Sequence, residues 1–432
     1  MRNSLTVAVL LAVAGAFVPL ARAATIESAP PLDLSMKKES PAAAEFRAGI
    51  QKLANGDLKG AEASFRKASQ LAPKSPEPLI GLADIEVRKG NPSAAESLLL
   101  QARQIAPNSP GLHVAFGRLY RTRGDIPRAR GEFEAAKRLA PGSVPPRMEL
   151  ADIYLRTGEP ARAEREFKDV IKVRPNDAAA HFGLGVALAA SGQSASAATA
   201  FEKSAQLAPN DPEPLRMLAR VEAERKRFPQ ALAALDRAIK RAPTSTALQM
   251  DRTSILLASG DPKGAVAAAQ AVAQANPDDA GVQAGLGHLL VATGNKPGAR
   301  RAYGRSIQLS QADAQVLNNA AWLEADEKGD LDKAAAWAKR ATELQPREAS
   351  YHDTWGWVQR ARGDLAGAEA SLNQAVMLAS PRAALIQYHL GIVRSERGQT
   401  AKAAESLAQA LKDGLGAPYA EDAKQRLAAL KK

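Results

Sequence analysis

The sequence predicts an all-α solenoid of about eleven helix–turn–helix repeats closed by a capping helix, and three observations support this fold class. Prolines recur every 34 residues over much of the chain, glycines keep the same period 17 residues earlier, and apolar residues are plentiful but rarely aromatic. The 432 residues are 45% hydrophobic and only 4% aromatic, so alanine and leucine supply most of the apolar content. Alanine favours helices because it loses no side-chain entropy there. A fixed period of this length indicates stacked repeats rather than two or three globular domains.

The first 23 residues have the pattern of a secretory signal peptide and are set apart from the fold. Arg2 supplies the positive charge, residues 5–18 are apolar, and residues 21–23 form a small-x-small cleavage site. The apolar stretch is short for a membrane span, although an uncleaved anchor is the alternative. We expect cleavage after Ala23 and a soluble periplasmic (alternatively secreted) chain without a stable membrane anchor. Residues 24–41 are polar and contain proline, which predicts a flexible linker.

The chain contains no cysteine and has a formal net charge of +12. Disulfides, cysteine-based metal sites, a thiol nucleophile and a lipid on an N-terminal cysteine are therefore excluded. The positive charge could attract acidic polymers or membrane surfaces, but the favoured interpretation is an arginine-rich solvated surface spread over many helices. Export argues against a nucleic-acid partner.

Each repeat is delimited by its glycine and its proline. Glycine ends the first helix because it accepts the left-handed conformation, and proline closes the second helix because it cannot continue one. The prolines are Pro73, Pro107, Pro141, Pro175, Pro209, Pro243 and Pro277. The glycines are Gly56, Gly90, Gly124, Gly158, Gly192, Gly260 and Gly294, with Lys226 at the vacant place and Gly329, Gly363 and Gly398 in slightly longer units.

Small residues also keep the period, which predicts close helix crossings. On the first helix they are Gly49, Ala83, Gly117, Ala151, Gly185, Ala219, Gly287, Ala321, Gly356 and Gly391. On the second helix they are Ala61, Ala95, Ala129, Ala163, Ala197, Ala231, Ala265, Ala299, Ala334, Ala368 and Ala403.

This order of residues resembles the tetratricopeptide repeat, whose pattern is an aromatic, Leu-Gly, Tyr, then Ala, Phe, Ala and a final Pro. Repeat three has Phe116, Gly117, Tyr120, Ala129, Phe133, Ala136 and Pro141 in these places. The resemblance implies a right-handed superhelix over residues 42–417. Residues 418–432, with Pro418 well placed to start a helix, are expected to cap the last repeat.

Three repeats depart from the pattern. Repeat seven has Thr253 and Ala269 where a small apolar residue and a large ring are expected, so its packing should be thinner. Repeat eight ends in Ser310 rather than proline, and repeat nine carries one extra residue in its inter-helix turn. Residues 253–313 are therefore a candidate place for the solenoid to bend.

No catalytic, cofactor or metal site is evident, so we expect a protein that is not an enzyme. The chain has no HExxH, P-loop or GxSxG motif. His113, His181 and His352 occupy the same place in three repeats, where the family has its aromatic, and this recurrence indicates packing rather than catalysis.

The resemblance implies that first helices line a concave groove, with one position per repeat pointing into it: Ile50, Asp84, Arg118, Asp152, Val186, Arg220, Ser254, His288, Trp322, Trp357 and Ile392. The predicted partner-binding residues are Asp84, Arg118, Arg121, Asp152, Arg156, Arg216, Arg220, His288, Trp322, Trp357 and Tyr388. The charged part suits a charged peptide or polymer. The aromatic part suits side chains or sugar rings, unless these rings pack between repeats.

Residues 315–432 resemble the ends of bacterial repeat proteins of exopolysaccharide and exosortase (PEP-CTERM) systems. The resemblance rests on the runs at 317–322, 329–332, 352–358 and 386–391. It implies a role in envelope polymer export or assembly. Three hypotheses follow: a scaffold for a protein partner, a protein that binds exopolysaccharide directly, and a periplasmic chaperone for outer-membrane or secreted chains.

Overall fold

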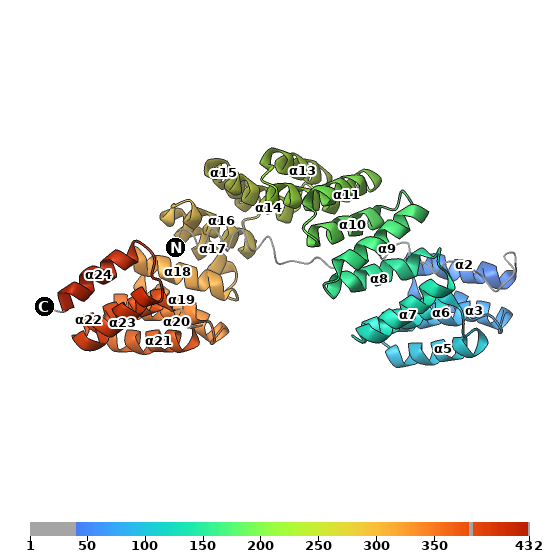
Figure 1. The fold of residues 1–432 in the computed structure, drawn as a ribbon, viewed down its shortest axis with the longest axis horizontal. Coiled ribbons are helices and arrows are strands. Elements are labelled where there is room, and N and C mark those ends of the chain that lie inside the picture. Colours follow the sequence, from blue (N-terminus) through green and yellow to red (C-terminus); the bar gives the residue numbers. More distant parts are fainter. Residues whose placement is uncertain (1–39, 380–382, 431–432) are drawn as a thin grey trace. The chain divides into compact units, whose positions relative to one another are not determined.

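The computed structural model describes residues 40–379 and 383–430, and the regular elements within these ranges are 23 α-helices with no strand (Figure 1). The predicted signal peptide and nearly all of the predicted linker lie outside the described residues. The chain divides into two compact units, one ending at Ser245 and the other beginning at Thr246. We describe each unit by itself.

The first unit contains six helix pairs, which are repeats one to six. The pairs are α2 (Pro41–Ala54) with α3 (Leu58–Leu71), α4 (Glu77–Arg88) with α5 (Pro92–Ile105), α6 (Pro110–Thr122) with α7 (Ile126–Leu139), α8 (Val144–Arg156) with α9 (Pro160–Val173), α10 (Ala178–Ala190) with α11 (Ser194–Leu207), and α12 (Glu213–Glu224) with α13 (Phe228–Arg241).

The second unit contains repeats seven to eleven and a final helix. The pairs are α14 (Thr246–Ala258) with α15 (Pro262–Ala275), α16 (Ala280–Ala292) with α17 (Lys296–Leu309), α18 (Ala314–Asp326) with α19 (Leu331–Leu344), α20 (Ala349–Ala361) with α21 (Leu365–Leu378), and α22 (Ala384–Glu396) with α23 (Thr400–Lys412). Helix α24 (Tyr419–Leu430) follows and packs on α23. The predicted all-helical fold of eleven repeats with a capping helix is confirmed, while the handedness of the superhelix and the bend near residues 253–313 stay predictions.

A left-handed residue ends the first helix of the repeats, as the glycine spacing predicted. The periodic glycines from Gly56 to Gly398, with the exception of Gly329, have φ between 71° and 88°. In repeat three the N–H of Asp125 donates to the Tyr120 carbonyl at 2.9 Å, and that of Gly124 donates to Arg121 at 3.0 Å. These bonds satisfy carbonyls that the helix leaves unpaired at its end.

Two lysines adopt the left-handed backbone conformation, although their side chains make it less favourable than for glycine. Lys226 occupies the vacant place with φ of 59°, and Lys328 has φ of 50°. The assignment of the left-handed place in repeat nine to Gly329 was therefore wrong, because Gly329 is the extra residue of that turn. A Cβ on Gly329 would collide with the Glu324 carboxylate and the Arg300 guanidinium, which explains why this position has no side chain.

The two helices of a repeat cross where a small residue faces a large one. A Cβ on Gly117 would lie 2.5 Å from the Phe133 ring, and a Cβ on Gly185 would lie 2.6 Å from that of Phe201. Both distances are below van der Waals contact, so these rings fit only against glycine. Repeats two and six instead combine alanine with leucine, as the buried pairs Ala83 with Leu99 and Ala219 with Leu235.

Repeats four and seven show how this rule adapts. Repeat four combines Ala151 with Phe167, and the room for that ring comes from Gly183 in the next repeat, where a Cβ would collide with it. Repeat seven reverses the sizes: Thr253 and Ala269 are both buried, and the Thr253 hydroxyl donates to the Gln249 carbonyl at 3.0 Å. The crossing of repeat seven is thus closed to solvent although neither of its two residues is large.

We predict that Lys226→Gly stabilises the first unit by about 0.5–1 kcal/mol, because the left-handed conformation costs a residue with a Cβ more than glycine loses in chain entropy. Gly158→Ala should cost about 1 kcal/mol by the same argument, since nothing lies near its Cβ position and only the backbone conformation is affected. Urea denaturation followed by circular dichroism measures both. Equal destabilisation by the two substitutions would contradict the assignment of this strain.

Candidate functional site

First helices of several successive repeats pack against one another within each unit. Helix α4 contacts both α2 and α6, α8 contacts α10, and α20 contacts both α18 and α22. The eleven positions predicted to face the groove lie on these helices, and we call the surface they define the first-helix face. Ten of the eleven side chains are partly exposed, whereas Ile392 is buried. Each unit therefore has a first-helix face along which equivalent side chains recur from one repeat to the next.

Four of the predicted residues come together in one chain of ion pairs between α6 and α8. Arg118 and Arg121 donate to the two carboxylate oxygens of Glu149, each at 2.7 Å. Arg121 also lies 3.7 Å from Asp152, which accepts from the Nε atom of Arg156 at 2.8 Å. We call these five residues the ion-pair chain. It joins repeats three and four across the first-helix face.

Glu149 was missed by the sequence analysis, although a signal for it existed. It lies three residues before Asp152, so both carboxylates share one face of α8. Its side chain is only 12% exposed because it lies under the two arginines. Asp84 is paired as well, with Arg88 on its own helix at 3.1 Å. This part of the face is therefore a paired, mixed-charge surface rather than a basic patch.

The remaining predicted arginines lie on α12, beyond an uncharged helix. Arg216 is 3.6 Å from Glu213, and Arg220 is partly buried. Helix α10, between α8 and α12 in the sequence of first helices, carries no Asp, Glu, Lys or Arg and presents the partly exposed Val186. The charged residues of the first-helix face thus form two groups, one on α4, α6 and α8 and the other on α12. The uncharged helix α10 separates them.

His288 lies partly buried on α16 with its ring edge-on to Tyr303, at 5.3 Å between centroids. Its Nε2 atom and the Tyr303 hydroxyl are buried and have no hydrogen-bond partner within the described residues. Burial lowers the pKa of His288 and raises that of Tyr303, because the charged form of each is costly in an apolar site. His288 is therefore a neutral packing residue more than an exposed binding group.

The predicted tryptophans are partly buried, with cations over their rings. The Trp357 centroid is 4.5 Å from the Arg360 guanidinium carbon and 4.3 Å from the His389 ring centroid. Sequence analysis missed both neighbours, which belong to the next turn of α20 and to α22. Much of the Trp357 ring is thus already in contact with this protein.

Trp322 packs in the same manner against the core of repeats eight and nine. The Nζ atom of Lys296 lies 5.9 Å from its ring centroid. Hydrogen bonds to the Asp326 and Glu327 carboxylates raise the pKa of Lys296 to about 12, so this lysine stays charged over the ring. The structure therefore favours the alternative in which the two tryptophans pack between repeats.

The prediction that Tyr388 is an exposed aromatic anchor was wrong. Tyr388 is 6% exposed because α24 covers it. Its hydroxyl donates to Asp422 at 2.7 Å and its ring lies 5.4 Å from that of Tyr419. Burial and the Asp422 carboxylate raise the pKa of Tyr388 to about 12. The capping helix, rather than a partner, occupies this surface.

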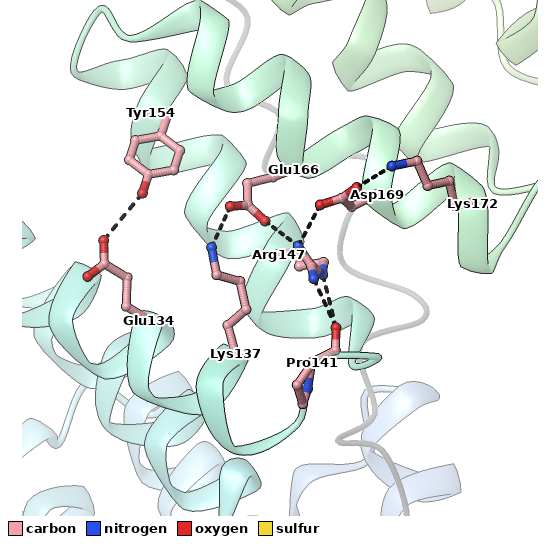
Figure 2. Close-up of polar contacts among 8 residues, drawn as sticks. All are labelled: Glu134, Lys137, Pro141, Arg147, Tyr154, Glu166, Asp169 and Lys172. Atoms are coloured by element: carbon pink, nitrogen blue, oxygen red, sulfur yellow. Dashed lines mark hydrogen bonds and ion pairs between the residues drawn. The ribbon is translucent and has the colours of Figure 1, made fainter.

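A second polar cluster ties repeats three and four together at their other face (Figure 2). Arg147 donates to Glu166 at 2.9 Å, to Asp169 at 3.0 Å and to the Pro141 carbonyl at 2.9 Å, and Lys137 donates to Glu166 at 2.6 Å. Hydrogen bonding by Lys172 lowers the pKa of Asp169. We call Arg147, Glu166, Lys137 and Asp169 the Arg147 network. Its groups satisfy one another, so it holds the repeats together.

Two of the three in-register histidines have the same role as Arg147. His181 and His352 each hydrogen-bond the carbonyl of the proline six residues earlier, at 2.9 and 3.0 Å. His113 instead contacts Glu132 at 2.6 Å. The three histidines therefore form hydrogen bonds to neighbouring groups. The sequence had indicated ring packing for this aromatic position.

Within residues 40–379 and 383–430, no group of three or more metal-ligating side chains occurs. No helix in the same ranges is long and apolar enough to cross a membrane.

The fold and this surface define a class of protein, the helical-repeat solenoid, which generally acts as a non-catalytic scaffold. Models of the tetratricopeptide repeat match residues 52–116, 188–252 and 256–323, and residues 148–212 and 354–421, which together cover more than half of the chain. The chain belongs to the tetratricopeptide repeat family and has the architecture of proteins that bind protein or peptide partners.

Solved structures of similar fold include the APC/C hetero-tetramer Cut9–Hcn1 (13% identity, covering 91% of this chain and 97% of that one, TM-score 0.43) and yeast Tom70 (14%, 91% and 96%, TM-score 0.42). PilF of Pseudomonas aeruginosa is similar over 48% of this chain and 95% of its own, with 18% identity and a TM-score of 0.42. No curated protein matches the chain.

His288 predicts a pH dependence of the second unit. Its pKa is near 6.5 in the unfolded chain and lower in the folded one. Above pH 6.5 both states are neutral and stability is complete; as the pH falls below 6.5 only the unfolded state takes up the proton, so stability is lost. We expect His288→Val, which reproduces Val186 of repeat five, to reduce this loss.

Tryptophan fluorescence during urea denaturation measures this effect in the second unit, because all four tryptophans lie between residues 322 and 357. Denaturation midpoints that fall in parallel for both proteins between about pH 6.5 and 5 would show that His288 is not buried in its neutral form.

Proposed function

We propose that this chain is an exported scaffold that binds an extended segment of a protein partner along the first-helix face of residues 40–245. The observation that carries the proposal is the ion-pair chain. It holds charged side chains, partly exposed and on two successive repeats, in fixed positions on the first-helix face. A rigid face of this kind recognises a polypeptide at little cost in side-chain entropy.

The pairing of the charges indicates the chemistry of the partner. Each arginine of the ion-pair chain already has a carboxylate, so a purely acidic polymer would have to displace Glu149 or Asp152 from part-buried positions. A polypeptide with both acidic and basic side chains can add to the pairs without leaving a charge uncompensated. The uncharged face of α10 beyond them suits an apolar side chain. These features favour a mixed-charge peptide over an acidic polymer.

Export and the envelope pathway rest on sequence features. The pattern of residues 1–23 supports a periplasmic location, and the resemblance of residues 315–432 supports a role in exopolysaccharide or envelope assembly. Direct stacking of sugar on Trp322 and Trp357 is disfavoured, because both rings are packed against neighbouring side chains. The polysaccharide would then be the cargo of the assembled machine rather than the ligand of this face.

Site-specific photo-cross-linking in the producing cells tests the proposal. A photoreactive residue at Arg156 on α8 should capture a polypeptide, whereas one at Lys168 on α9 should not. The two side chains belong to the same repeat and are similarly exposed, 49% and 55%, so they form a matched pair. This protein, recovered from the same cells, should begin at Ala24 when its own N terminus is sequenced.

Equal capture from both positions would show that contact is not specific to the first-helix face. Capture of nothing at Arg156 under conditions where the chain is folded would also contradict the proposal. Recovery of this protein with residues 1–23 intact would contradict the proposed export. The proposed binding would then be judged by the cross-linking result alone.

A further inference from the structure

A cleft of about 220 Å³ opens in the second unit between repeats seven and eight. It is lined by residues of α15, α16, α17 and the turn before α17: Gln270, Gln283, Leu286, Leu290, Asn295, Gly298, Arg301 and Ala302. On α16 the lining positions 283, 286 and 290 share one side, roughly opposite to His288. The cleft is therefore separate from the first-helix face and from the function proposed for it.

The cleft is the equivalent, four repeats later, of the interface that the Arg147 network fills (Figure 2). Adding 136 residues to Glu134, Arg147, Tyr154 and Glu166 gives Gln270, Gln283, Leu290 and Ala302. The same shift turns Lys137 into Ala273 and Arg162, whose guanidinium lies over the Tyr154 ring, into Gly298. These six side chains are thus replaced by uncharged ones, most of them smaller, whereas Asp169 of the Arg147 network is replaced by Arg305, which pairs with Asp278.

These replacements remove the carboxylates that could pair with a basic side chain in the cleft. Helices α15, α16 and α17 contain no Asp or Glu. Of the basic residues on α17, Lys296, Arg300 and Arg305 are paired with acidic residues elsewhere. Arg301 is exposed on the cleft wall and makes no ion pair with any residue that the structure describes. The local charge of the cleft is therefore positive and uncompensated.

The other lining groups indicate which chemical groups a bound anion should have besides its charge. Leu286 and Leu290 offer an apolar wall, and Leu290 is almost fully buried. Gln283 is held by a hydrogen bond from its Nε2 atom to the Ala273 carbonyl at 3.2 Å, which leaves its Oε1 atom able to accept another. The volume far exceeds the roughly 30 Å³ of a single water.

We propose that this cleft binds a carboxylate attached to a short apolar chain, with Arg301 holding the carboxylate and Leu286 and Leu290 contacting the chain. A guanidinium matches a carboxylate through two parallel hydrogen bonds. Two sources have this chemistry, the C-terminal residue of a peptide and a free small carboxylic acid. An amide N–H beside the carboxylate, present only in the peptide, can donate to Gln283.

Ligand-observed saturation-transfer NMR on the full chain tests this with N-acetyl-leucine and hexanoate. We expect saturable binding in the millimolar range, as befits so small a ligand. Tighter binding of N-acetyl-leucine would identify a peptide C-terminus, and tighter binding of hexanoate a free acid. N-acetyl-leucinamide, which lacks the carboxylate, should bind at least about tenfold more weakly than N-acetyl-leucine.

Three variants complete the experiment. Arg301→Gln should weaken binding at least about tenfold, and Ala302→Leu, which fills the cleft, should abolish it. Arg165→Gln, at the equivalent position of repeat four, should leave binding unchanged. Arg301 is exposed, so its replacement decides the matter even if Ala302→Leu impairs folding. No saturation up to about 20 mM, equal binding of the amide, or unchanged binding by Arg301→Gln would overturn the proposal.

Discussion

The distance between the two helices of a repeat is the constraint on which the rest of this structure depends. A crossing that holds a large ring requires a very small residue close to that ring, as with Gly117 against Phe133. A single repeat buries little surface, so its stability comes from neighbours that must stack at a regular spacing. An error at one crossing would change that spacing and would misplace every inter-repeat contact that follows it, including the ion-pair chain.

With the crossings fixed, the interfaces between repeats are free to differ. Repeats three and four use a network of charges, and repeats seven and eight have mostly small or uncharged residues at the same positions. The helices begin and end at equivalent residues in both, even though repeat eight ends in Ser310 without a proline, so the helix bounds do not depend on these side chains. A repeat protein can in this way vary its binding chemistry from one interface to the next without changing its fold.

The periodic features could be predicted from sequence because each depends on a residue and its near neighbours. The glycine turns, the proline ends and the alanine crossings all belong to this kind. The error at Gly329 arose because the spacing does not tell which of two adjacent residues, Lys328 or Gly329, takes the left-handed conformation in the longer turn. Features that join residues some thirty apart were missed: Glu149 under Arg118, and α24 over Tyr388. Spacing alone does not tell which side chains meet across repeats.

The cleft could not be predicted from the pattern of a single repeat. The substitutions that open it are individually ordinary in an Ala-rich chain, and only the filled Arg147 network reveals what is missing. The predicted thinning of repeat seven pointed to the correct region for a different reason, because the Thr253–Ala269 crossing is filled while the interface with repeat eight is not. Comparing equivalent positions in different repeats of one chain therefore shows which interfaces lack side chains that others have, and a single repeat cannot show this.

The central claim, that the small-to-large pair sets the helix spacing, is tested most directly by a double-mutant cycle of Gly117→Ala and Phe133→Leu. Gly117→Ala alone should cost about 1–3 kcal/mol by overpacking, but much less in the Phe133→Leu background, since repeats two and six combine alanine with leucine. Gly131→Ala, with nothing near its Cβ on α7, serves as the control and should stabilise the helix slightly. If urea denaturation gives the same cost for Gly117→Ala in both backgrounds, the crossing does not set the spacing and the account is wrong.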